Sequence, residues 1–430
     1  MDIYEPQGDN LSIRPAIIFA HSGGFINGNR NHEDMVAFCD SLARKGYVTA
    51  TIDYRKSFYI LENVTLHGVR AVYRGIQDGR SAVRFLRANA STYGIDPDKV
   101  YMAGSSAGGF IALHAAYMNE PNEQSSETHF STYTDLLFPF FHEAPEMGPI
   151  DIGLHLSENG QPDGIINLWG AIQTKDLITN ADYTPALLVH GTADTTVSFE
   201  RDHPFSFPAF PEVDGSSLIH DTMMTLGITH ETYFVTGEPH EFHGTDNGDW
   251  PGEPNQFWDI ILDRTSSFLW DRHKPLVNFS LQNAAPLTVD FQDESEDALA
   301  WWWDFGDSTT SNEQHPTHQY TVEGDYTVTL YIENDKESWN EITQMVTAED
   351  TLNITENNTP NIALYPNPVH EKLHIKGIGN GNISLINMLG QTLLKANINN
   401  SIDVSHLPKG LYTVYLTDKN STQTKKILKL

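Results

Sequence analysis

The chain has 430 residues, a formal net charge of −31 and a hydrophobic fraction of 39%. This length predicts two or three folded domains, since a single core stops growing well before this size. The acidic excess argues against a nucleic-acid partner, because such binding depends on Lys and Arg neutralising phosphates. The sequence contains no run of about 18 apolar residues, so it predicts no membrane span.

The only cysteine is Cys39, so an intrachain disulfide is impossible. Cys39 shares a helical apolar face with Met35, Phe38 and Leu42, and this spacing predicts a buried thiol. The first residues, Asp2 to Tyr4, already have the pattern of a strand, and no signal peptide precedes them. We therefore expect the chain to lack its native N-terminus.

Strand and helix patterns alternate through the first 274 residues, which predicts a mostly parallel sheet covered by helices. The expected strands are 16–20, 48–53, 100–103, 165–169, 186–190 and 231–235, and the expected helices are 31–45, 68–90, 107–118 and 255–271.

A G-x-S-x-G motif at residues 104–108 stands between the strand at 100–103 and the helix at 107–118. A serine on such a strand-to-helix turn is exposed at the edge of the sheet, and glycines allow the tight turn. The following helix N-terminus favours developing negative charge. The motif predicts Ser106 as a nucleophile.

The acid and the base are expected later in the chain, in the order Ser, Asp, His. Asp194 follows the buried strand 186–190, at the strand end where open α/β sheets place their chemistry. His240 follows the strand 231–235 and is the expected base. His243 is the rival candidate for that role.

The loop His21-Ser22-Gly23-Gly24-Phe25 follows the strand 16–20. It resembles the H-G-G-G loop of esterases and lipases, with serine in place of the first glycine. With the motifs above, residues 1–274 resemble the α/β-hydrolase superfamily, and within it the small carboxylesterases of the hormone-sensitive-lipase and feruloyl or acetyl esterase type. The resemblance implies an α/β-hydrolase fold, a Ser106–His240–Asp194 triad, and an oxyanion hole formed by the amides of Gly23, Gly24 and Ala107.

Two segments interrupt the alternation, one from 119 to 164 and one from 199 to 215. Loops that follow the carboxyl ends of strands overhang the active site, and both segments are rich in aromatic residues and proline. They are expected to form a lid or an acyl pocket, or else to pack a satellite core. Phe25 and Trp169 are further candidates for walls of the substrate pocket.

From about residue 275 the pattern becomes all-β. The motifs W-D-F-G-D at 303–307, P-x-H-x-Y at 316–320 and G-x-Y-x-V at 324–328 resemble those of the polycystic-kidney-disease (PKD) module, an Ig-like sandwich. Period-two alternation predicts that Trp303 points inward and Trp302 outward. The resemblance implies a spacer or a substrate platform at 275–348.

Residues 349–362 are polar and acidic and are expected to form a linker. The motifs Y-P-N-P at 365–368 and L-x-x-G-x-Y at 407–412 follow, and the chain ends in a Lys-rich stretch. Residues 363–430 thereby resemble the C-terminal sorting domain of the type IX secretion system of Bacteroidota, a second small all-β sandwich. This resemblance implies a secreted or cell-surface protein that engages the type IX machinery.

Taken together, the sequence predicts a secreted serine carboxylic ester hydrolase that acts through an acyl-enzyme and needs no metal or organic cofactor. The expected substrates are short-chain or aromatic esters, such as feruloyl or acetyl esters of polysaccharide, or a polyester. Two alternatives stay open: a serine peptidase of the prolyl-oligopeptidase type, and a surface adhesion protein whose hydrolase domain is inactive.

Overall fold

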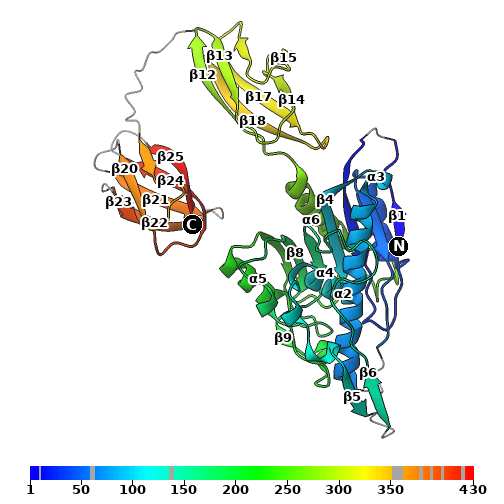
Figure 1. Cartoon of the computed structure of the whole chain (residues 1–430). Helices are drawn as coiled ribbons and strands as arrows, with labels where there is room; N and C mark the ends of the chain where they lie inside the picture. The colour runs from blue at the N-terminus through cyan, green and yellow to red at the C-terminus, as the bar shows by residue number, and fades with distance from the viewer. Residues whose placement is uncertain are drawn as a thin grey trace. The chain divides into compact units, whose positions relative to one another are not determined.

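The computed structural model describes residues 1–8, 11–58, 63–134, 140–350, 362–376, 381–387, 391–398, 401–417 and 422–430. Contacts between residues divide the chain into two compact units, Met1–Ala348 and Glu349–Leu430. The first unit contains a helix-covered sheet and, after it, a β-sandwich (Figure 1).

The centre of the first unit is a seven-stranded sheet in the order β1-β3-β2-β4-β7-β8-β11. The edge strand β1 pairs antiparallel with β3, and the other neighbours are parallel. This confirms the predicted mostly parallel sheet. The strands are β1 (Asp2–Tyr4), β2 (Arg14–Ala20), β3 (Val48–Ile52), β4 (Ile95–Ser105), β7 (Ile165–Leu168), β8 (Ala186–Gly191) and β11 (His230–Val235).

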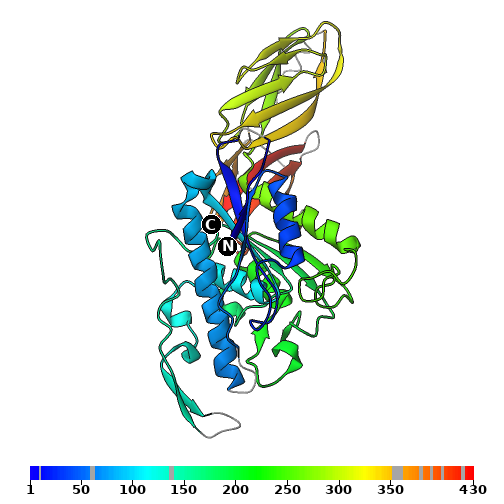
Figure 2. The same cartoon turned by 90° about the vertical axis from the view of Figure 1, so that its right-hand side faces the viewer.

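Helices cover both faces of the sheet, and each face has its own hydrophobic core. One core holds alternate strand residues such as Ile18 and Met102 under α2 (Val64–Ala88), α4 (Ala107–Tyr117) and α5 (Ser216–Leu226). The other holds Ile17 and Tyr101 under α1 (Glu33–Ala43) and α6 (Gln256–His273). Figure 2 shows α2 and α1 on opposite sides of the sheet. Among the described residues, no helix has the length and hydropathy needed to cross a membrane.

Three details differ from the sequence expectations or sharpen them. Helix α2 begins at Val64, four residues before the expected start, because the side chain of Asn63 accepts a hydrogen bond from the Leu66 amide and caps the helix. Helix α5 was not expected, and only its buried residues Ile219 and Met223 mark an apolar face. Cys39 is a buried thiol, as predicted.

The segment after α4 extends away from the sheet as a hairpin and returns along α2 (Figure 1). Its elements are η1 (Pro121–Glu123), η2 (Ser126–Thr128), β5 (Ser131–Thr134) and β6 (Phe141–Ala144), while the short α3 (Ala90–Tyr93) lies earlier in the chain, before β4. The segment after β8 contains η4 (Pro204–Ser206) and a two-stranded sheet of β9 (Arg201–Asp202) and β10 (Val213–Asp214). A single turn, η3 (Lys175–Leu177), follows β7.

The remainder of the first unit is an antiparallel sandwich with its own core. Trp303 is fully buried in this core and Trp302 is 44% exposed, which confirms their predicted directions. One sheet has β12 (Phe279–Ala285), β13 (Thr288–Asp293) and β16 (Thr317–Gln319), and the other has β15 (Thr310–Ser311), β14 (Ala300–Asp304), β17 (Gly324–Glu333) and β18 (Trp339–Ala348).

The second unit is another antiparallel sandwich with a separate core. One sheet has β19 (Ala363–Tyr365), β20 (Lys372–Lys376) and β23 (Ser401–Asp403), and the other has β22 (Thr392–Asn397), β21 (Asn382–Asn387), β24 (Gly410–Thr417) and β25 (Thr422–Lys429). The expected linker at 349–362 falls largely on residues 351–361, which lie outside the described residues.

Candidate active site

Ser106 lies in a sharp turn between β4 and α4, with a φ of 53° and a ψ of −112°. This is a strained conformation for a residue other than glycine. A Cβ on Gly104 would lie 2.1 Å from the backbone of Gly108, and a Cβ on Gly108 would lie 2.0 Å from the carbonyl oxygen of Ala20. Both glycines are therefore required by close backbone contacts, and together they hold the serine at the edge of the sheet.

His240 connects Ser106 with Asp194. Its Nε2 lies 2.9 Å from Ser106 Oγ, and its Nδ1 lies 2.6 Å from Asp194 Oδ2. Because a carboxylate only accepts hydrogen bonds, Nδ1 carries the proton and Nε2 accepts from the serine hydroxyl. The sequence placed these three residues in one site, and the structure brings them together in an arrangement that can move a proton from the serine to the imidazole.

Asp194 is held as a carboxylate by four donors. The amides of Thr196 and Val197 donate to Oδ1 at 2.8 and 2.9 Å, and His240 and His190 face Oδ2 at 2.6 and 3.2 Å. Burial by itself would raise the pKa of this group, but the hydrogen bonds and charges of the two histidines outweigh burial and lower the pKa well below its usual range.

His190 is a site residue that the sequence reasoning missed. It is fully buried at the end of β8, and its Nε2 faces Val197 O at 2.9 Å as well as Asp194. Its Nδ1 lies 2.8 Å from Ser216 Oγ, which in turn accepts from Asn167 at 3.1 Å. Since Ser216 accepts from Asn167, its hydroxyl can donate to Nδ1 of His190. The proton of His190 therefore lies on Nε2, which faces Asp194. The available signal was a histidine in an apolar strand, four residues before the acid.

His243, the rival base, does not contact Ser106 in the described hydrogen bonds. It is fully buried on the opposite face of the sheet, where its ring packs against Trp169, Trp250 and Trp258. Its Nε2 lies 3.6 Å from Oδ2 of buried Asp34. Burial raises the pKa of Asp34, and His243 offsets this only in part.

The glycine loop between β2 and α1 presents free amide groups. Gly23 has a φ of 116° and Gly24 a φ of 58°, and a Cβ on Gly23 would lie 2.5 Å from the carbonyl oxygen of Asn27. Among the described residues, the amides of Gly23, Gly24 and Ala107 donate to no other protein group. Gly24 and Ala107 line the same cavity as Ser106. These N–H groups are the donors that the arrangement offers to a developing oxyanion.

Of the two expected pocket walls, Phe25 lines the cavity and Trp169 does not. Trp169 is fully buried, and its indole N–H donates to Ser105 Oγ at 2.9 Å. The expectation for Trp169 was wrong because β7 ends at Leu168 and the positive φ of Trp169, 44°, directs its ring into the core beneath α1 and α6.

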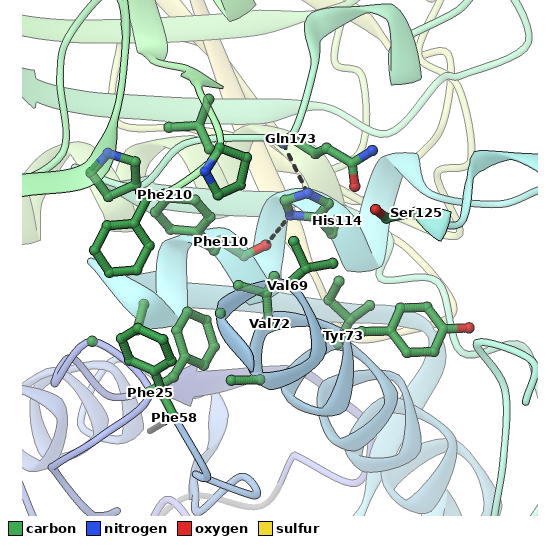
Figure 3. A pocket seen from close by; sticks show the side chains of 18 of the residues that line it. Phe25, Phe58, Val69, Val72, Tyr73, Phe110, His114, Ser125, Gln173 and Phe210 are labelled. Atoms are coloured by element: carbon green, nitrogen blue, oxygen red, sulfur yellow. Dashed lines mark hydrogen bonds between the residues drawn. The ribbon is translucent and has the colours of Figure 1, made fainter. Parts of the chain in front are cut away.

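The cavity beside Ser106 is mostly apolar (Figure 3). The segment after Asp194 contributes Phe205, Phe210 and Val213, and the segment after α4 contributes Ser125 and Thr128. Both interrupting segments therefore contribute walls to the cavity, as one of the two sequence expectations proposed.

Comparison with known proteins finds three regions of the chain that match known families. Residues 1–138 match the BD-FAE family, residues 277–349 the PKD domain, and residues 363–429 the secretion system C-terminal sorting domain. The chain thus carries an esterase-type α/β-hydrolase domain, and residues 1–138 of that domain are similar to the BD-FAE family. The sorting domain is of the type IX kind and indicates a secreted or cell-surface protein.

Among curated proteins, the chain is 21% identical over 257 residues to an isoprenylcysteine alpha-carbonyl methylesterase of Arabidopsis thaliana, covering 56% of this chain and 53% of the relative. It is 31% identical over 110 residues to the carboxylesterase NlhH of Mycobacterium tuberculosis, covering 26% and 30%. The chain spans about half or less of the length of these relatives. A solved esterase 2 of Thermogutta terrifontis aligns at 20% identity and a TM-score of 0.44, covering 63% of this chain and 88% of that one.

Proposed function

We propose that the protein is a serine carboxylic ester hydrolase with Ser106 as nucleophile, His240 as base and Asp194 as the group that orients and stabilises the imidazolium. The observation that carries this proposal is His240 within hydrogen-bond distance of both Ser106 Oγ, at 2.9 Å, and Asp194 Oδ2, at 2.6 Å. This is the geometry that an acyl-transfer triad requires.

In the first half of the reaction, Ser106 Oγ attacks the ester carbonyl carbon while His240 Nε2 takes the hydroxyl proton. The negative charge that develops on the carbonyl oxygen is stabilised by the free amides of Gly23, Gly24 and Ala107. The C–O bond to the alcohol then breaks, and the imidazolium gives its proton to the departing oxygen, leaving an acyl-enzyme.

In the second half, His240 takes a proton from water as the water oxygen attacks the acyl-enzyme. The bond to Ser106 Oγ breaks, the serine recovers its proton, and the carboxylic acid leaves. Every proton in this cycle passes through His240 Nε2, and Asp194 stays ionised throughout because four donors face its carboxylate.

The proposed substrates are short-chain or aromatic esters, such as feruloyl or acetyl esters of polysaccharide, or a polyester. Support comes from the BD-FAE match of residues 1–138 and from the apolar cavity beside Ser106. The PKD and sorting domains are consistent with action outside the cell on a large substrate.

The test is hydrolysis of p-nitrophenyl acetate and butyrate by the full chain and by Ser106→Ala. Loss of the nucleophile is expected to lower kcat on the order of 10⁶-fold with unchanged thermal unfolding. Ser105→Ala is the matched control, since it removes one hydroxyl at the neighbouring position and only deprives the Trp169 indole of its acceptor. Activity that survives Ser106→Ala and disappears in Ser105→Ala contradicts the proposal, as does a full chain that hydrolyses no ester.

A further inference from the structure

The cavity beside Ser106 continues along the whole length of α4. Ser106, Phe110, His114 and Met118 all line it, each four residues after the last, so they form one stripe along that helix. Twelve residues of helix advance by about 18 Å. The cavity is therefore elongated, with Ser106 at one end of the stripe.

Helix α2 forms the facing wall. It contributes Gly68, Val69, Val72 and Ile76 to the lining. A Cβ at Gly68 would only reach ordinary contact, 3.6 Å, with the rings of Phe58 and Phe210, so the glycine leaves open space in this wall. Figure 3 shows Val69 and Val72 between the rings of Phe25, Phe58 and Phe210 on one side and His114 and Ser125 on the other.

The polar groups at the far end are satisfied by the protein itself. His114 Nδ1 faces the Phe110 carbonyl oxygen at 2.7 Å, and its Nε2 accepts from the backbone N–H of Gln173 at 3.0 Å. Burial lowers the pKa of His114 to about 4, so the ring is neutral at pH 7. Thr128 Oγ1 donates to the Ser125 carbonyl oxygen at 2.7 Å. Glu212 also lines the cavity but is exposed, which places its carboxylate at the solvent side.

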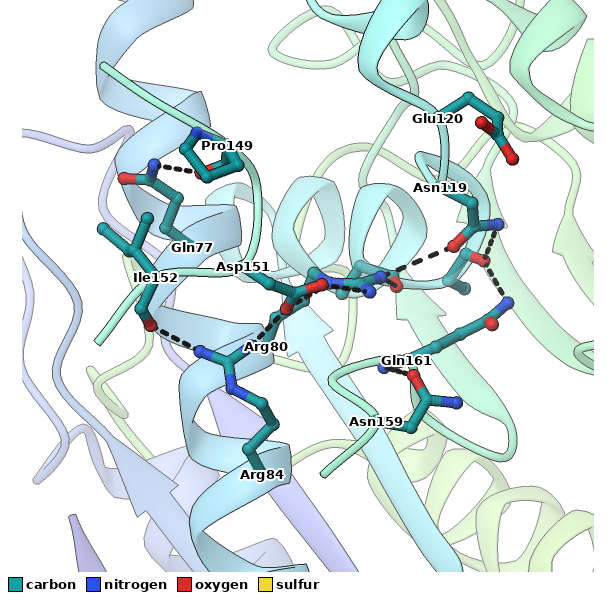
Figure 4. A network of polar contacts seen from close by, with 12 residues as sticks. Gln77, Arg80, Arg84, Asn119, Glu120, Pro149, Asp151, Ile152, Asn159 and Gln161 are labelled. Carbon is teal, nitrogen blue, oxygen red and sulfur yellow. Dashed lines mark hydrogen bonds and ion pairs between the residues drawn. The ribbon is translucent and has the colours of Figure 1, made fainter. Parts of the chain in front are cut away.

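The far wall is fastened to α2. Arg70 donates to the carbonyl oxygen of Glu127 at 2.8 Å, beside the Ser125–Thr128 wall. Further along the helix, Arg80 and Arg84 bind the carboxylate of Asp151, and Arg84 donates to the carbonyl oxygen of Ile152 at 2.6 Å (Figure 4). Arg84 is fully buried. The segment that closes the channel is thus anchored by directional bonds, and the channel has a fixed end.

We propose that this channel binds the acyl group of the substrate and selects long, straight aliphatic chains. The inference rests on the proposed function, because Ser106 must be acylated at the channel's end. An extended chain advances about 1.2 Å per bond, so a channel of about 18 Å accommodates roughly fifteen carbons. The best acyl group is then a longer aliphatic chain than the acetyl and feruloyl groups named under the proposed function.

The experiment measures kcat/KM on p-nitrophenyl esters from acetate to hexadecanoate with the full chain. Burial of each methylene is expected to raise kcat/KM by two- to fourfold until the channel is filled. Val72→Phe narrows the middle of the channel and should reduce the decanoate-to-acetate ratio at least tenfold. Ser125→Phe, at the far end, should reduce activity only on the longest chains.

Met224→Phe is the matched control, because it adds the same ring at a 48% exposed position of α5 outside the channel. It should change kcat/KM on neither the short nor the long esters. Thermal unfolding checks that each variant folds. If Val72→Phe does not fold, Ser125→Phe, at a half-buried turn, tests the channel in its place. A wild-type chain that is fastest on acetate overturns the channel proposal while leaving the esterase intact. Unchanged ratios of long-chain to acetate activity in both Val72→Phe and Ser125→Phe also overturn the channel proposal. A chain that is inactive on every ester overturns the proposed function itself.

Discussion

Two histidine–carboxylate pairs flank the loop after β11, one on each face of the sheet. His240 and Asp194 are 2.6 Å apart on the side of Ser106, while His243 and Asp34 are 3.6 Å apart beneath tryptophan rings. The carboxylate of Asp194 has four donors, whereas the amide of Met35, at 2.7 Å, is the hydrogen-bond donor that the structure gives to Asp34. The pKa of Asp194 is accordingly lowered and that of Asp34 raised.

The comparison shows that a nearby histidine does not by itself make a carboxylate a strong acid in a buried site. The number and distance of the donors decide whether hydrogen bonding overcomes burial. The first pair has a defined proton position and a serine to act on. The second pair joins the His240 loop to α1, and its role is expected to be structural.

The largest difference is expected in catalysis. His240→Ala removes the group that takes the serine proton, so kcat on p-nitrophenyl acetate should fall on the order of 10⁶-fold. His243→Ala should retain most of the activity per folded molecule, because its ring does not reach Ser106. Both variants are compared at a temperature where each is folded; equal losses would mean that the two pairs are not functionally distinct.

The second pair, His243 and Asp34, is expected to contribute more to the stability of the fold than to catalysis. His243→Ala leaves Asp34 buried without its partner and opens space among three tryptophans, so we expect a loss of about 3 kcal/mol in the free energy of unfolding. His243→Phe keeps the ring and removes only the partner, and urea unfolding of both variants separates packing from charge. A loss below 0.5 kcal/mol in His243→Ala would show that the pair does not hold the loop.

His190→Leu tests whether the extra donor of Asp194 matters for catalysis. Without it the carboxylate is less firmly oriented, and kcat should fall about tenfold to a hundredfold. Asp194 would then place more of its charge on His240, so the acid limb of the kcat/KM profile should move to higher pH. His190→Gln can donate to Asp194 and accept from Ser216 and should restore the profile; a stability loss with an unshifted profile would leave His190 a packing residue.

The opposite pKa shifts predict opposite pH effects on stability. Folded Asp34 keeps its proton to a higher pH than the unfolded chain does, so its contribution to stability falls as pH rises above about 4. Asp34→Asn should therefore gain relative to wild type between pH 4 and pH 8. Asp194 has a lowered pKa, so its contribution to stability is complete above about pH 4 and is lost as pH falls below that value. The stability difference between Asp194→Asn and wild type should therefore be constant between pH 4 and pH 8 and should shrink between pH 4 and pH 2. Urea unfolding at pH 2, 3, 4, 6 and 8 gives both dependences, and the same pH dependence in the two variants would refute the contrast.

The smallest effect is expected from residues that touch neither pair. The unit Glu349–Leu430 is separate from the unit that holds both pairs. Truncation after Asp350 should leave kcat on p-nitrophenyl acetate within about twofold, or ~0.4 kcal/mol in the barrier. A larger change in a truncated chain with unchanged thermal unfolding would assign the sorting domain a part in the site.

The sequence predicted the sheet and the sharp turn at Ser106 well, because both depend on local patterns. Buried parallel strands give apolar runs, and the glycines at 104 and 108 reflect backbone contacts too close for any Cβ. The order of Ser106, Asp194 and His240 along the chain follows from where parallel strands end. The side-chain surroundings of these residues follow from no such pattern.

The direction of Trp169 depended on a single positive φ at the end of β7, which no spacing rule predicts. His190 acts through Ser216, which belongs to a helix that the periodicity did not reveal. The separation of His240 from His243 was drawn from order and loop position, and the structure adds the reason: three residues along the loop, the chain has passed to the other face of the sheet.

The long polar side chains of α2 determine which residues of the neighbouring segment can be substituted. Tyr73, Gln77, Arg84 and Arg87 donate to main-chain carbonyl oxygens between residues 148 and 161. Among the described hydrogen bonds, the side chains that α2 contacts in the stretch from 148 to 163 are the carboxylates of Asp151 and Asp163. Because α2 binds mainly the backbone of this segment, the other side chains of the segment can be substituted without loss of these hydrogen bonds. The stretch from 148 to 163, which supports the channel wall without lining it, is thus open to exchange between enzymes as long as its two aspartates and its course along α2 are kept.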